Sequence, residues 1–136
     1  MVVRSNAPVE LKKALTGAWY ETMSAMSGKD KTAKDAIAVM AKKAGGTVAE
    51  FEAQLKTTAM YYSAKDAVEF SKGKKLQETM EYVRSFSFEH GLFGEGAKTK
   101  DTVGISFPDG TVTGNKDNIK LRFDASYMQM AADGKL

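Results

Sequence analysis

The chain has 136 residues, no cysteine and a formal net charge of +3, from 20 lysine and arginine residues against 17 aspartate and glutamate residues. This length suits one domain with a single core, and the lack of cysteine excludes disulfides, thiolate metal sites and cysteine nucleophiles. No run approaches the roughly 18 to 20 apolar residues that cross a bilayer, so we predict a globular chain that is not membrane-spanning.

The basic residues are mostly lysines spread along the chain, and the three arginines lie far apart at Arg4, Arg84 and Arg122. A nucleic-acid-binding face usually gathers arginines and aromatic residues on one element. The pattern here is typical of a solvated surface, and we predict no nucleic-acid partner.

The first predicted helix begins near Pro8 and ends at Gly28. Proline suits a first helical turn, and the helix dipole favours the carboxylate of Glu10 there. Apolar residues then recur at helical spacing: Leu11, Leu15, Trp19, Met23 and Met26. This stripe predicts that Trp19 lies in the core.

Three more helices are predicted in the middle of the chain. One runs from about Lys31 to Ala44 and stops at Gly45-Gly46. Thr47-Val-Ala-Glu50 is a capping box that opens a short helix. Ser63-Ala-Lys-Asp66 repeats this capping pattern and opens a helix that stops at Gly73.

A fifth helix is predicted from about Lys74 to Glu89, after which the hydrophobic period changes from 3.6 to 2. Residues 103–107 and 119–123 alternate as strands, and Pro108-Asp109-Gly110 indicates a hairpin. Asp124 is expected to cap a last helix. The predicted fold class is therefore α+β and predominantly helical, with five or six helices and a small β element near residues 101–123, in a single domain of residues 1–136.

Four residues between the third and fourth helices are the most plausible ligand contacts: Thr57, Thr58, Tyr61 and Tyr62. Aromatic faces and hydroxyls on a short connector are what a small-molecule cleft uses. The alternative is that these side chains cover the edge of the core and satisfy their hydroxyls at the surface. The sequence leaves both interpretations open.

Signals for catalysis are weak. The single histidine, His90, falls in a last helical turn, where it interacts favourably with the helix dipole, and no serine elbow accompanies it. The glycines at 91, 94 and 96 follow no strand and enclose Glu95, which would repel a pyrophosphate. Metal-ligand spacing is absent. We predict no enzyme, no cofactor and no metal site.

Four motifs spread over the chain resemble one protein family: Leu15-Thr-Gly-Ala-Trp-Tyr-Glu-Thr-Met, Leu55-Lys-Thr-Thr-Ala-Met-Tyr-Tyr, Phe86-Ser-Phe-Glu-His-Gly-Leu-Phe-Gly and Val103-Gly-Ile-Ser-Phe-Pro-Asp-Gly. The sequence is similar to the carboxyl-terminal part of ABC-transporter substrate-binding proteins of the nitrate, sulfonate and taurine type, closest to the urea or short-chain amide branch. These are type 2 periplasmic binding proteins with two α/β lobes and a hinge. The resemblance implies that Val2-Val3-Arg4 is a strand leaving the hinge, and that the helix of residues 8–27 packs on a sheet.

The resemblance further implies a fragment of this two-lobed fold without its amino-terminal lobe. Its function would be to capture a small polar solute (amide or urea, nitrate, sulfonate or taurine) for an ABC permease. The implied location is periplasmic or extracellular, although this chain shows no signal peptide.

An alternative is a stand-alone helical interaction module that self-associates. Exposed strand edges and apolar patches favour pairing with a second copy, so we expect a homodimer or higher oligomer with residues 101–136 at or near the interface.

Overall fold

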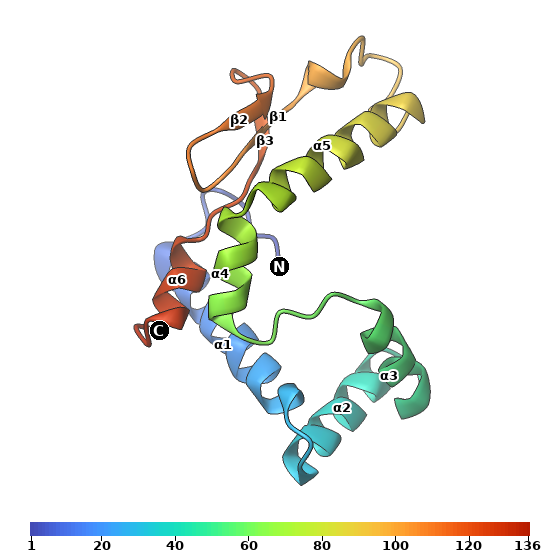
Figure 1. Ribbon diagram of the computed structural model, residues 1–136, viewed down its shortest axis with the longest axis vertical. Helices are drawn as coiled ribbons and strands as arrows, with labels where there is room; N and C mark the ends of the chain where they lie inside the picture. Colours follow the sequence, from blue (N-terminus) through green and yellow to red (C-terminus); the bar gives the residue numbers. More distant parts are fainter. The chain divides into compact units, whose positions relative to one another are not determined.

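The computed structural model describes residues 1–136, which form six α-helices, a short 3-10 helix and a three-stranded sheet (Figure 1). The predicted class, predominantly helical with a small β element, is confirmed. The chain divides into two compact units. The first unit comprises Met1–Ala67 and Tyr127–Leu136, and the second comprises Val68–Ser126. That both belong to a single domain stays a prediction.

The first unit is built from helices, and three of them start at a side-chain cap. The helices are α1 (Val9–Ser27), α2 (Lys31–Lys43), α3 (Val48–Thr57), the start of α4 (Ala64–Lys72) and most of α6 (Ser126–Ala132). Asp30 Oδ1 accepts a hydrogen bond of 2.9 Å from the Ala33 amide at the start of α2. Thr47 and Glu50 form the expected capping box at α3, and Ser63 Oγ accepts from the Asp66 amide at α4. These caps confirm three predicted helix starts.

The buried face of the first unit differs from the predicted apolar stripe. Met23 and Met26 are buried, but Trp19 is 44% exposed and Leu11 47% exposed. The prediction that Trp19 lies in the core is wrong. The helix α2 packs on α1 but covers only part of its apolar stripe. The side chains that α2 buries there are the small ones of Ala33 and Ala41.

The strand implied at Val2-Val3-Arg4 is not formed, and Val2 is 85% exposed. A strand requires a hydrogen-bonded neighbour, and the three strands of the chain pair only with one another. The expectation of a strand at this segment is therefore corrected to an exposed irregular segment.

The second unit packs α5 (Lys74–Glu89) against a sheet of β1 (Gly104–Ser106), β2 (Val112–Gly114) and β3 (Ile119–Arg122). The strand order is β2-β1-β3, with β1 antiparallel to β2 and parallel to β3. The expected turn is present, with Gly110 at φ +84°, but it joins β1 to β2, and the predicted strand at residues 119–123 pairs with β1 in parallel. The strand β2 and the 3-10 helix η1 (Lys100–Thr102) were not predicted.

The core of the second unit joins α5 to the sheet. Leu76, Ile105 and Phe107 are buried together, and partly buried apolar side chains pack on them: Phe70, Met80, Leu121 and Phe123. The rings of Phe107 and Phe123 stack with their centroids 5.6 Å apart. The alternation predicted for both strands therefore directs their apolar side chains to one core.

A glycine pair allows β1 and β2 to approach each other. Gly104 lies opposite Gly114, and a Cβ at Gly104 would come within 2.1 Å of the Asn115 carbonyl oxygen. A Cβ at Gly114 would come within 2.2 Å of the Val103 carbonyl oxygen, and its φ is +80°. Glycine is therefore required at both positions.

Candidate functional site

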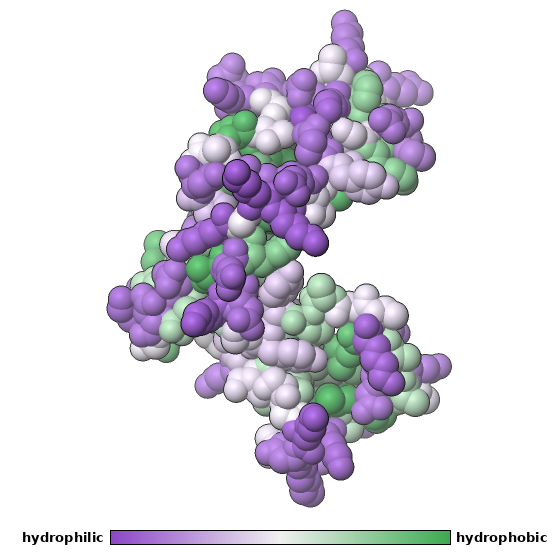
Figure 2. Space-filling view, in the orientation of Figure 1, coloured by the Kyte–Doolittle hydropathy of each residue, from purple (hydrophilic) through white to green (hydrophobic).

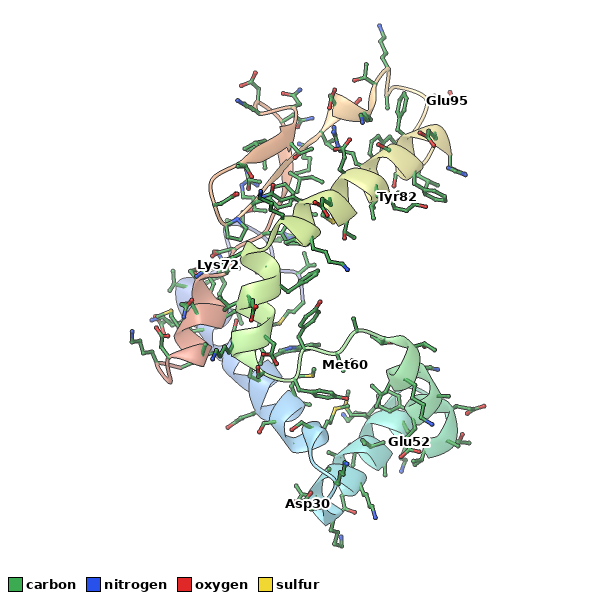
Figure 3. The ribbon with its side chains drawn as sticks, viewed as in Figure 1. Asp30, Glu52, Met60, Lys72, Tyr82 and Glu95 are labelled. Atoms are coloured by element: carbon green, nitrogen blue, oxygen red, sulfur yellow. The ribbon has the colours of Figure 1, made fainter.

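The four predicted ligand contacts lie on or beside the connector between α3 and α4. Thr57 is the last residue of α3, Thr58 is its C-cap, and Tyr61 and Tyr62 follow in irregular backbone before Ser63. Met60, labelled in Figure 3, marks the connector. The connector thus lies between a helix opened by a capping box and a helix opened by a serine cap.

The two threonine hydroxyls have local partners. Thr57 Oγ1 donates to the Gln54 carbonyl oxygen at 3.0 Å, and Thr58 Oγ1 donates to the same oxygen at 2.8 Å. The last carbonyls of a helix lack partners within the helix, so both hydroxyls satisfy the carboxyl end of α3. Their protons are occupied, and what they can offer a ligand is an acceptor lone pair.

Tyr61 and Tyr62 are half-buried, unlike the exposed threonines that precede them. A half-buried tyrosine presents part of its ring face while the rest of the ring is held by packing, which suits stacking on a flat polar molecule. Of the four predicted residues, the tyrosines therefore keep the stronger capacity for ligand binding.

A small hollow lies in the second unit, away from these four residues in the sequence. Its volume is about 170 Å³, and its main apolar lining comes from α5, the loop after it and two strands: Met80, Val83, Phe93, Ile105 and Leu121. Small-molecule sites usually measure roughly 300–1,000 Å³. Sequence reasoning missed this hollow because its lining comes from four separate segments, and the only signal was the shared apolar face of helix 74–89 and strand 103–107.

An ion-pair network lies beside this hollow. Arg84 is 6% exposed, and its guanidinium contacts the carboxylates of Glu81 and Asp101 and the carbonyl of Lys100. Lys100 Nζ lies 2.5 Å from Glu81 Oε1 and 3.2 Å from Ser85 Oγ. The network joins η1 to α5 and pairs each cation with a carboxylate, so its charges balance internally.

The ionisation of the network follows from these contacts. Hydrogen bonds from Lys100 and then from Arg84 lower the pKa of Glu81. Burial alone would lower the pKa of Arg84, but its bonds to Asp101 and Glu81 outweigh the burial and raise it. Glu81 and Arg84 therefore stay ionised near neutral pH, and their contacts hold η1 to α5 rather than supply an acid or a base.

His90 is also held by local contacts. Its Nδ1 lies 2.9 Å from the Phe86 carbonyl oxygen, and its ring stacks on Phe86 with centroids 3.9 Å apart. Because a carbonyl only accepts, Nδ1 carries the proton in this contact. The structure brings no group of three histidine, cysteine, aspartate or glutamate side chains together in a way that could hold a metal ion. No helix combines the length and the hydropathy needed to cross a membrane.

The chain matches no protein-family model, no curated protein and no solved structure. The similarity to ABC-transporter substrate-binding proteins therefore depends on the four sequence motifs and stays a prediction.

Proposed function

We propose that this chain is the carboxyl-terminal part of a solute-binding component of an ABC importer, and that it holds a small polar solute without changing it chemically. The observation that carries the proposal is the connector with Tyr61 and Tyr62, two half-buried rings in irregular backbone between two side-chain-capped helices. The carboxyl end of α3, bonded by the Thr57 and Thr58 hydroxyls, and the Ser63-capped start of α4 flank these rings and restrict them before the ligand arrives, which lowers the entropic cost of binding. The motif resemblance supplies the solute class: urea or short amides, with nitrate, sulfonates and taurine as relatives.

The uncovered face of α1 supports the assignment to a two-lobed parent. Leu11 and Trp19 are both nearly half exposed on this helix. In the family that the motifs resemble, the corresponding helix packs on a sheet, and such packing would cover these side chains. In that setting the parent would deliver its solute to an ABC permease from the periplasmic or extracellular side.

Calorimetric titration with urea, acetamide, nitrate and taurine tests the proposal. We expect at least one solute to bind, and Tyr61→Ala and Tyr62→Ala each to weaken binding by about tenfold, the effect of losing one stacked ring. Tyr82→Ala is the matched control, because Tyr82 is 71% exposed on α5 and belongs to the second unit. Failure of all four solutes to bind, or equal weakening by Tyr82→Ala, would contradict the proposal.

A second candidate function is self-association of a helical interaction module. The observation that favours it is the pair of open sheet edges, since β2 and β3 each pair only with β1. Open edges are templates for pairing with another chain. Sedimentation equilibrium should then show a dimer that Arg122→Pro on β3 disrupts, because the amide of Phe123 bonds β1 and the amide of Arg122 therefore faces the open edge, where proline blocks pairing. A folded protein that stays monomeric at high concentration would contradict this candidate.

A further inference from the structure

The helix α5 has an exposed aromatic face. Tyr82 is 71% exposed and Phe86 44% exposed, although both rings are large and apolar. The two rings lie one turn apart with centroids 6.5 Å from each other, and His90 stacks on Phe86 one turn further. Figure 3 shows Tyr82 on the side of α5 away from the strands, and Figure 2 shows hydrophobic atoms exposed among hydrophilic ones over this unit.

The charged residues at the two ends of α5 have the signs that the helix dipole disfavours. The first turn of α5 carries Lys74 and Lys75 and no acid, while its last turn carries Glu89 and no basic residue. All three side chains are exposed and none forms an ion pair. A cation at the amino end and an anion at the carboxyl end of a helix are both unfavourable. The isolated helix therefore keeps an electrostatic cost that a suitable partner would relieve.

We propose that this face binds the same face of a second copy of the chain, with the two α5 helices antiparallel. Lys75 precedes Tyr82 by the same number of residues as Glu89 follows it, so a two-fold axis at Tyr82 brings each Lys75 to the partner's Glu89. This arrangement also places Glu89 at the partner's amino-terminal helix end, where the dipole favours an anion. A parallel pair would instead set Lys75 against Lys75. Complementary charge, self-complementary symmetry and an exposed aromatic centre thus select a second copy as the occupant.

The expected dimer is weak. One helix face buries less surface than the roughly 1,200 Å² of the smallest stable interfaces, so we expect a dissociation constant on the order of 100 μM. The interface is independent of the proposed solute site, since it lies on α5 and not on the connector. It also differs from strand-edge pairing, because it leaves both sheet edges free.

Charge reversal with sedimentation equilibrium up to millimolar concentration tests the inference. Lys75→Glu and Glu89→Lys should each weaken the dimer by about tenfold, since either change creates two repulsive contacts across the axis. The double variant should return most of the affinity. Lys34→Glu is the control, because it makes the same charge change at an exposed position of α2 and should leave the dimer unchanged.

These variants distinguish a loss of dimerisation from a loss of folding. Lys75→Glu places an acid in the first turn of α5, so its thermal stability as a monomer should equal or exceed that of the wild type. Tyr82→Ser should abolish the dimer while circular dichroism stays unchanged, because Tyr82 is exposed. A wild-type protein that is monomeric at millimolar concentration, or a double variant that associates no better than the single reversals, would overturn the inference. A dimer lost with Arg122→Pro but kept in both reversals would also overturn it and place the interface at the sheet edge.

Discussion

Trp19 is the only tryptophan of the chain and is 44% exposed, so its fluorescence reports directly on the uncovered face of α1. We expect acrylamide and iodide to quench it readily in the native protein. Trp19→Ala should lower the free energy of unfolding by only ~1–2 kcal/mol, because much of the ring is already in water. Met23→Ala, at a buried position one turn further along α1, should cost about 2–4 kcal/mol. Quenching no greater than in a buried indole would contradict the exposure of Trp19.

The ionisation of Glu81 makes the stability that the ion-pair network contributes depend on pH. Its pKa is lowered in the folded chain, first by the hydrogen bond from Lys100. A carboxyl with a lowered pKa stabilises the fold above its unfolded value of 4.5, and this contribution is lost as the pH falls through the folded value. Glu81→Gln should therefore melt at a lower temperature than the wild type at pH 7, and the difference should shrink below pH 4.5.

The control for this prediction is Glu78→Gln, which removes an exposed carboxylate without an ion pair from the same helix. Its melting temperature should differ little from that of the wild type at pH 7. A difference between Glu81→Gln and the wild type that stayed constant from pH 7 to pH 3 would show that the carboxylate pairs do not stabilise the fold.

At the scale of single elements, side-chain caps stabilise the starts of two helices. Thr47→Ala and Ser63→Ala should each lower the free energy of unfolding by ~1 kcal/mol, because each removes the acceptor for an amide at a helix start. Thr22→Ala is the matched control. Thr22 lies inside α1, is exposed and bonds only its own helix, and alanine is the better helix former, so this change should be neutral or stabilising. Chemical denaturation of the three variants measures the difference, and equal effects would reject the caps.

The close approach of β1 and β2 gives a second prediction at this scale. Gly104→Ala and Gly114→Ala should each destabilise the protein by more than ~2 kcal/mol, because the new Cβ would overlap a carbonyl oxygen. Gly96→Ala should have little effect, since no atom lies within 4 Å of the added Cβ and its φ is ordinary. Thermal unfolding followed by circular dichroism would measure all three, and a stable Gly104→Ala variant would contradict the register of the sheet.

Elements with local signals could be predicted from the sequence, and elements that depend on distant partners could not. The start of α3 follows from Thr47 and Glu50, which lie within one turn of each other. The strand β2 has only three residues and exists because Gly114 fits against β1, which no local pattern encodes. The side of α1 that becomes buried depends likewise on α2, so the stripe identified a helix without showing that Trp19 would remain exposed.

At the scale of the whole molecule, the chain forms two compact units. Features of the candidate sites that depend on residues close in the sequence could be predicted, and features that depend on distant contacts could not. The connector could be found because its four residues are neighbours in the sequence. The hydrogen bonds from the Thr57 and Thr58 hydroxyls to the Gln54 carbonyl oxygen could not be predicted, because they depend on where α3 ends. Burial of Arg84 was equally unforeseen, because arginine is usually exposed and its partner Asp101 lies in another element.

The most direct test of the central claim is an amide NMR titration of the isotope-labelled protein with urea, acetamide, nitrate and taurine. The proposed function predicts that one solute shifts the amide signals of residues 57–62 in a saturable way, and that Tyr61→Ala and Tyr62→Ala reduce these shifts. Shifts confined to the residues around the hollow of the second unit, or no saturable shift with any of the four solutes, would contradict the claim that the connector binds the solute.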